Sequence, residues 1–134
     1  MKKIEHIGIA VRDLASSNLL YEKLLGAQVY KEEYVEAESV MTSFIQMGES
    51  KIELLQACSP DSAIAKFIEK KGEGIHHIAF EVHDILTEME RLRVQGFQVL
   101  NEQPKKGADN KLICFVHPKD TRGVLIELCQ SIQD

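Results

Sequence analysis

The chain contains the same segment twice, and this repeat limits the folds that it can adopt. Residues 6–14 (HIGIAVRDL) align with residues 77–85 (HIAFEVHDI), and residues 52–56 (IELLQ) align with residues 126–130 (IELCQ). A repeat of this length indicates one supersecondary unit used twice. The second copy is about three residues longer, and we place the extra residues in the turn at 117–123, because turns tolerate insertions best.

Each copy predicts a strand, a helix and three further strands. An alternating apolar run (4–11 and 75–82) is typical of a half-buried strand, and the Asp that follows it can cap a helix. The amphipathic segment after that Asp ends at a glycine, Gly26 or Gly96, which favours a helix end. Three strand-like runs complete each copy. They cover about 27–35, 40–47 and 51–57, then about 97–101, 111–116 and 124–130.

The stretch between the copies predicts a linker and no third domain. Residues 59–62 (SPDS) can open a helix over 63–71, and Gly72-Glu73-Gly74 can close it. We therefore expect one domain over 1–134, with a first module at about 1–58, a linker helix at about 59–74 and a second module at about 75–134.

Composition excludes several classes of protein. With 134 residues, 44% hydrophobic and 28% charged, the chain can bury a core and is not disordered. It has no membrane-length apolar run and no apolar stretch at the N-terminus, so we expect a soluble, cytoplasmic protein. The net charge of −5, without a basic run interleaved with aromatics, argues against nucleic acid as a partner. Three cysteines without a C-x-x-C spacing predict reduced thiols: Cys58, Cys114 and Cys129.

One histidine recurs at the same place in each copy. Alternate side chains of a strand share a face, so His6 lies on the face of Gly8, and His77 lies on the face of Ala79. The other face of each strand is apolar and can pack on the helix. Small residues beside each imidazole leave room for a ligand.

One glutamate recurs as well, since Glu53 and Glu127 interrupt strands that are otherwise Ile and Leu. Taken singly, a strand histidine is usually a satisfied or solvent-facing residue, and such a glutamate usually marks the wet side of a sheet. Two histidines and two glutamates in matching register are, however, the donor set that a first-row divalent metal accepts. We assign no site role to His76, His83 or His117.

The repeat and three motifs resemble the vicinal oxygen chelate superfamily and, within it, the methylmalonyl-CoA epimerase family. The motifs are residues 6–11 (HIGIAV), the linker at 62–77 (SAIAKFIEKKGEGIHH), and 117–119 (HPK) followed by 123–128 (GVLIEL). The resemblance covers essentially the whole chain. It implies an α+β fold in which two tandem βαβββ modules form a cupped mixed sheet around a metal site, and it implies a homodimer.

The resemblance also implies the ligands and the reaction. The ligand set would be His6, Glu53, His77 and Glu127, holding Co²⁺ or alternatively Ni²⁺, Zn²⁺ or Mn²⁺. The reaction would be the metal-dependent R/S interconversion of methylmalonyl-CoA at C2, between propionyl-CoA carboxylation and succinyl-CoA formation. The C2 hydrogen lies between a thioester carbonyl and a carboxylate, and a metal that chelates an oxygen of each would stabilise the enolate.

Inversion of C2 needs acid/base groups on both sides of the planar enolate. We expect Glu127 as the first catalytic residue and Glu53 as the second. Some family members use a separate Glu on the third strand, but the matching stretch here, 39–42 (SVMT), has no carboxylate. For the CoA phosphates, Lys119 beside Pro118 is the first candidate. The others are Lys105, Lys106, Lys111 and Arg122.

Three other functions stay open at this point. The first is glyoxalase I (lactoylglutathione lyase), which resembles the chain at the same four ligand positions but is disfavoured by the linker and the final HPK motif. The second is a non-catalytic member of the superfamily that binds a small ligand, although such binders usually lose ligand residues. The third is a module used only for assembly, which predicts that His6→Ala and Glu127→Ala change neither metal content nor activity.

Overall fold

The computed structural model describes residues 1–132, which divide into two compact units. The first unit is His6–His76, and the second consists of Met1–Glu5 together with the residues from His77 onward. Strands β1 (Lys3–Ala10) and β5 (Gly74–Glu81) contribute residues to both units. Within 1–132, none of the helices has the length and apolar character needed to cross a membrane.

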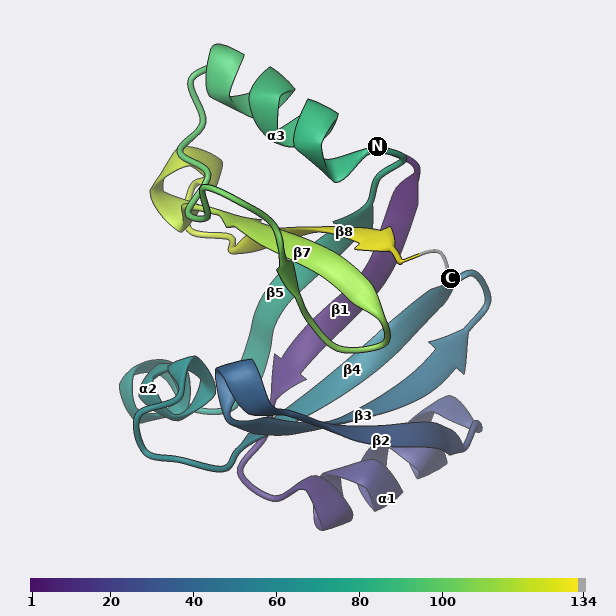
Figure 1. Cartoon of the computed structure of the whole chain (residues 1–134). Helices are drawn as coiled ribbons and strands as arrows, with labels where there is room; N and C mark the ends of the chain where they lie inside the picture. The colour runs from purple at the N-terminus through teal and green to yellow at the C-terminus, as the bar shows by residue number, and fades with distance from the viewer. Residues whose placement is uncertain (133–134) are drawn as a thin grey trace. The chain divides into compact units, whose positions relative to one another are not determined.

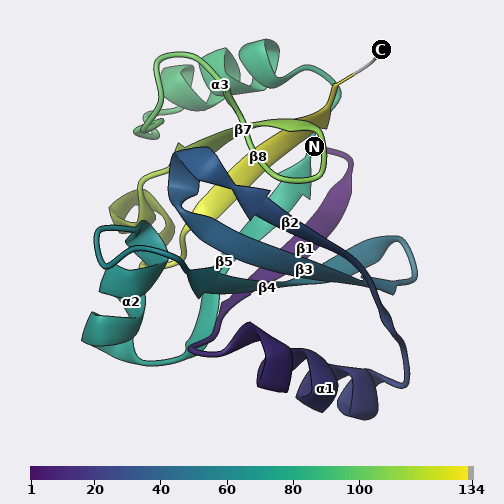
Figure 2. The same ribbon diagram turned by 60° about the horizontal axis from the view of Figure 1, so that its bottom comes forward.

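The first unit has the predicted β-α-β-β-β order. Its sheet has the order β2-β3-β4-β1, in which β4 is parallel to β1 and the other neighbours are antiparallel. Helix α1 lies along one face of this sheet (Figures 1 and 2). The elements are β1 (Lys3–Ala10), α1 (Leu14–Leu25), β2 (Val29–Val35), the 3-10 turn η1 (Glu36–Glu38), β3 (Val40–Met47), β4 (Ser50–Ala57) and the linker helix α2 (Ala63–Lys71).

Helix α1 begins and ends at the residues that the sequence predicts. The Asp13 carboxylate accepts a hydrogen bond from the Ser16 N–H at 3.0 Å, and Gly26 ends the helix in the left-handed region with φ 66°. The Leu14 N–H, at the start of the helix, donates to the Gln56 side-chain oxygen at 2.6 Å. A residue of β4 therefore satisfies a helix N–H that has no partner within the helix.

The second unit repeats this arrangement. Its sheet has the order β5-β8-β7-β6, in which β8 is parallel to β5 and the other neighbours are antiparallel. The Ile85 N–H donates to the Gln130 side-chain oxygen at 2.7 Å, as Leu14 does to Gln56. The elements are β5 (Gly74–Glu81), α3 (Ile85–Val94), β6 (Lys105–Lys106), β7 (Lys111–Val116), the 3-10 turn η2 (Pro118–Thr121) and β8 (Ile126–Ser131).

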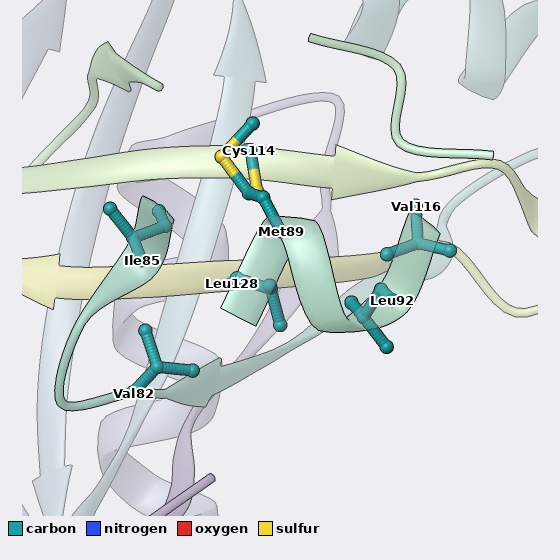
Figure 3. Close-up of a cluster of buried hydrophobic side chains, with 7 residues drawn as sticks. All are labelled: Val82, Ile85, Met89, Leu92, Cys114, Val116 and Leu128. Carbon is teal, nitrogen blue, oxygen red and sulfur yellow. The ribbon is translucent and has the colours of Figure 1, made fainter. Parts of the chain in front are cut away.

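The core of the second unit lies between α3 and the face of β7 and β8 that it covers (Figure 3). The side chains of the helix that point to the sheet recur every three or four residues, as an amphipathic helix requires. The opposite face of β7 and β8 is thereby left for other groups. The buried cluster consists of Val82, Ile85, Met89, Leu92, Cys114, Val116 and Leu128.

One predicted strand is wrong. Residues 97–101 form only an isolated bridge between Val99 and Val116. The strand that pairs with β7 at the edge of the sheet is the two-residue β6. The backbone hydrogen bonds from the Leu100 N–H to the Phe115 oxygen and from the His117 N–H to the Gln98 oxygen are kept. Side chains replace two others: Asp120 accepts from the Gln98 N–H at 2.6 Å, and Asn101 accepts from the Phe115 N–H at 3.0 Å. The predicted insertion lies where η2 extends the connection between β7 and β8.

Candidate active site

In the first unit, the recurring histidine and glutamate are in contact. Gly8 on β1 is the Cα partner of Glu53 on the parallel strand β4, and His6 lies two residues before Gly8 on the same face. His6 Nε2 is 3.2 Å from Glu53 Oε1. Both residues are buried, with exposed fractions of 6% and 4%. The register of β1 and β4 therefore brings the recurring histidine and glutamate of this unit together.

The second unit builds the same pair in the same register. Ala79 on β5 is the Cα partner of Glu127 on β8, and His77 lies two residues before Ala79. His77 Nε2 is 3.5 Å from Glu127 Oε1, and the two residues are 3% and 5% exposed. The repeat is thus reproduced at the level of individual side-chain atoms.

The donor atoms of each pair fit a divalent metal. With metal–ligand bonds of about 2.1 Å, neighbouring ligand atoms on one ion are about 3.0–3.4 Å apart in octahedral or tetrahedral geometry. The Nε2 to Oε1 distances of 3.2 Å and 3.5 Å lie close to this range. Imidazole and carboxylate are also the ligand types that Zn²⁺, Co²⁺, Ni²⁺ and Mn²⁺ accept together. Each unit therefore offers one pair of donor atoms that a divalent metal can accept.

A phenylalanine that was not predicted from the sequence lies beside each glutamate. Phe44 on β3 is the Cα partner of Glu53, and Phe115 on β7 is the Cα partner of Glu127. The Phe115 ring packs edge-on against the His77 ring, with centroids 6.3 Å apart and an interplanar angle of 88°. The repeat could have revealed these residues, since each phenylalanine lies on the strand that precedes its glutamate in the chain.

Two of the lysines proposed for the CoA phosphates, Lys111 and Lys119, have different surroundings. Lys111 is only 8% exposed, and its Nζ is 2.8 Å from Ser131 Oγ, 3.7 Å from a Glu81 oxygen and 4.0 Å from a Glu5 oxygen. This buried ion-pair cluster does not suit a contact with a CoA phosphate. Lys119 lies in η2, where its backbone N–H donates to His117 Nδ1 at 3.1 Å.

Two of the three cysteines are buried and keep their protons. Burial, and then the charge of Glu127, raises the pKa of Cys114 to about 11, and the same two causes raise the pKa of Cys129 further. Both thiols are therefore neutral at physiological pH and do not act as nucleophiles. Cys58 is exposed.

The fold and the two pairs agree with comparisons to known proteins. Residues 5–115 match the family model of the Glyoxalase/Bleomycin resistance protein/Dioxygenase superfamily, and the chain belongs to this superfamily. This result confirms the resemblance and the α+β glyoxalase-like fold expected from the sequence.

Within the superfamily, the chain is similar to methylmalonyl-CoA epimerases. It is 42% identical over 130 residues to the ethylmalonyl-CoA/methylmalonyl-CoA epimerase of Cereibacter sphaeroides, covering 96% of this chain and 97% of that protein. It is 39% identical to the human mitochondrial methylmalonyl-CoA epimerase, covering 96% and 74% of the two chains. A solved methylmalonyl-CoA epimerase in complex with methylmalonyl-CoA and NH4+ superposes with a TM-score of 0.94 at 36% identity, covering 98% and 95%.

Proposed function

We propose that this protein is an isomerase that interconverts the R and S forms of methylmalonyl-CoA at C2. The observation that carries the proposal is the pair of buried histidine–glutamate contacts in matching register, His6 with Glu53 and His77 with Glu127. The epimerase names of the relatives point to the substrate.

We assign all four residues of the two pairs as ligands of one divalent metal ion, with Co²⁺ favoured and Ni²⁺, Zn²⁺ or Mn²⁺ as alternatives. When bound, such an ion supplies Lewis-acid stabilisation of the negative charge that develops on the enolate oxygens. The donor distances within each pair support this assignment. The imidazoles orient the carboxylates, and the apolar neighbours Phe44 and Phe115 lower the local dielectric, which strengthens these interactions.

The proton chemistry falls to the two glutamates. One carboxylate removes the C2 proton and leaves the electron pair on the enolate, and a protonated group on the opposite side returns a proton to C2. We assign Glu127 as the first acid/base residue and Glu53 as the second. Because the two stand at equivalent positions of a repeat, they can act in either direction, as an epimerase requires.

Three further assignments complete the proposal. The active protein would be a homodimer, it would work in the cytoplasm, and Lys119 would contact a CoA phosphate. The acyl-CoA substrate of the relatives and the position of Lys119 in the short turn η2 support the last assignment.

The test of the proposal is solvent deuterium incorporation at C2 of methylmalonyl-CoA, followed by mass spectrometry. The Co²⁺-loaded protein is compared with chelator-treated protein and with the uncatalysed exchange. Rapid exchange that depends on the metal supports the proposal, and Glu127→Gln should then lower the rate more than Glu53→Gln does. Exchange at the background rate by metal-loaded protein would overturn it, and the hemithioacetal of glutathione would become the next substrate to assay.

A further inference from the structure

A lysine lies on the same face of the second unit's sheet as the His77–Glu127 pair. Lys105 on β6 is the Cα partner of Ile113, and Ile113 is in turn the Cα partner of Cys129. Residues that are paired across antiparallel strands, or two apart on one strand, share a face. Lys105 therefore shares the face of Glu127, which lies two residues from Cys129.

Phe115 connects this lysine to the histidine. Lys105 Nζ lies 5.9 Å from the centroid of the Phe115 ring, at the distance of a cation–π contact. The same ring packs edge-on against His77, with centroids 6.3 Å apart. The ammonium is thus held over a ring that touches the candidate metal ligand, and the lysine side chain is partly buried.

The neighbouring residue and the repeat indicate that this placement is specific. Lys106 follows on β6, faces the other side of the sheet and is exposed. At the equivalent register of the first unit, β2 carries Glu33, the Cα partner of Thr42. One module therefore has a lysine and the other a glutamate at matching positions, and the Glu33 carboxylate pairs with Lys31 Nζ at 3.3 Å, so the two halves differ at this register.

We propose that Lys105 binds the carboxylate of the methylmalonyl group, the one that is not part of the thioester, and is a positioning and specificity residue for the reaction. This inference rests on the proposed function. An ammonium is a strong hydrogen-bond donor to a carboxylate, and such a charged contact gains strength beside an aromatic ring that excludes water. It would favour 2-substituted malonyl thioesters over thioesters without the second carboxylate.

The contact also bears on which bond of C2 breaks. A bond of C2 breaks most readily when it stands perpendicular to the thioester plane, because its electron pair then flows into the carbonyl. A carboxylate held near that plane leaves the C–H bond in the reactive position. A carboxylate free to rotate can leave as CO₂, with its bonding electrons remaining on C2, and a proton from solvent then gives propionyl-CoA. Lys105 would therefore suppress decarboxylation.

The experiment compares Lys105→Met with Lys106→Met, which removes an equal charge from the other face of the same strand. We expect Lys105→Met to lower kcat/KM for C2 exchange by about 10- to 150-fold, the loss of one hydrogen bond to a charged group. It should act mainly through KM and raise the fraction of propionyl-CoA formed. Lys106→Met should keep the wild-type fraction of propionyl-CoA, and Lys105→Arg should recover part of the loss. Metal content and melting temperature check that each variant is folded and loaded.

A second substrate distinguishes binding of the acyl carboxylate by Lys105 from binding of the CoA phosphates, which are the other anions that a lysine could bind. Methylmalonyl-pantetheine lacks the nucleotide and its phosphates, and the loss caused by Lys105→Met should be the same with it. A loss seen only with the CoA thioester would overturn the proposal in favour of a phosphate contact. A Lys105→Met protein that behaves like Lys106→Met would also overturn it, whereas a wild-type protein without exchange activity would overturn the proposed function itself.

Discussion

Glu53 stands opposite Gly8 on the neighbouring parallel strand, and the missing side chain at Gly8 leaves the carboxylate a path to the imidazole of His6. In the second unit, Ala79 occupies the equivalent place opposite Glu127. A small residue therefore lies opposite the glutamate of each pair.

The metal assignment predicts that either histidine is needed for metal binding. His6→Ala and His77→Ala each remove one of two paired donors, and we expect each to weaken Co²⁺ affinity by more than the roughly 10- to 100-fold that loss of an outer-shell partner costs. Equilibrium dialysis followed by elemental analysis measures this. His83→Ala is the matched control, since His83 is exposed and follows β5, the strand that holds His77. Unchanged affinity in both ligand variants would contradict the assignment.

The structure shows which parts of the fold local sequence signals can predict. The linker helix, Ala63–Lys71, and strands β3 and β7 have the bounds expected from periodicity and caps, because Ser62 caps the helix and the apolar pattern covers each strand. The error at 97–101 has a different origin. Asp120 and Asn101 satisfy backbone groups there with their side chains, and no local pattern indicates that.

The candidate site also contains some residues that the sequence can predict and others that it cannot. The two histidine–glutamate pairs follow from the repeat, because their contact depends only on the parallel register that both copies share. Lys105 and Lys111 could not be separated from the other lysines by sequence. Strand β6 has two residues, too few for an alternating pattern, and the carboxylates beside Lys111 belong to residues distant in the chain, Glu5 and Glu81.

Gln130 is expected to stabilise the start of α3. Its side-chain oxygen accepts the Ile85 N–H at 2.7 Å, so Gln130→Met, which keeps the volume but removes the acceptor, should lower the free energy of unfolding by about 1 kcal/mol. Gln130→Glu keeps an acceptor and adds negative charge at a helix N-terminus, so it should retain the wild-type value. Urea unfolding measures both, and equal stability of the Met variant would show that the contact contributes nothing.

Lys111 is expected to be a structural residue. Lys111→Met removes the ammonium from a buried cluster that includes the carboxylates of Glu5 and Glu81, and we expect a loss of about 3 kcal/mol in the free energy of unfolding. Adding Glu5→Gln should restore part of that loss, because it removes a buried charge that the lysine balances. Lys106→Met serves as the exposed control. If Lys111→Met were as stable as Lys106→Met, the cluster would have no net stabilising role.

The contact between Glu88 and Arg91 predicts a specific dependence of stability on pH. Arg91 Nε donates to Glu88 Oε2 at 2.8 Å, and this hydrogen bond lowers the pKa of the Glu88 carboxyl against the opposing effect of burial. Between the ordinary glutamate pKa of about 4.3 and the lowered value, the unfolded chain binds a proton that the folded chain does not. The stabilisation is therefore complete above about pH 4.3 and is lost as the pH falls through the folded-state pKa.

Glu88→Gln tests this dependence by removing the titrating group. At pH 7 we expect it to be about 0.5 kcal/mol less stable than the wild type, the size of a pair on one helix face, and the difference should shrink as the pH is lowered through that window. Glu90→Gln, an exposed neighbour on α3, should show no such pH-dependent difference. Urea unfolding from pH 3 to pH 7 measures the three proteins together, and a constant offset between Glu88→Gln and the wild type across that range would contradict the assignment.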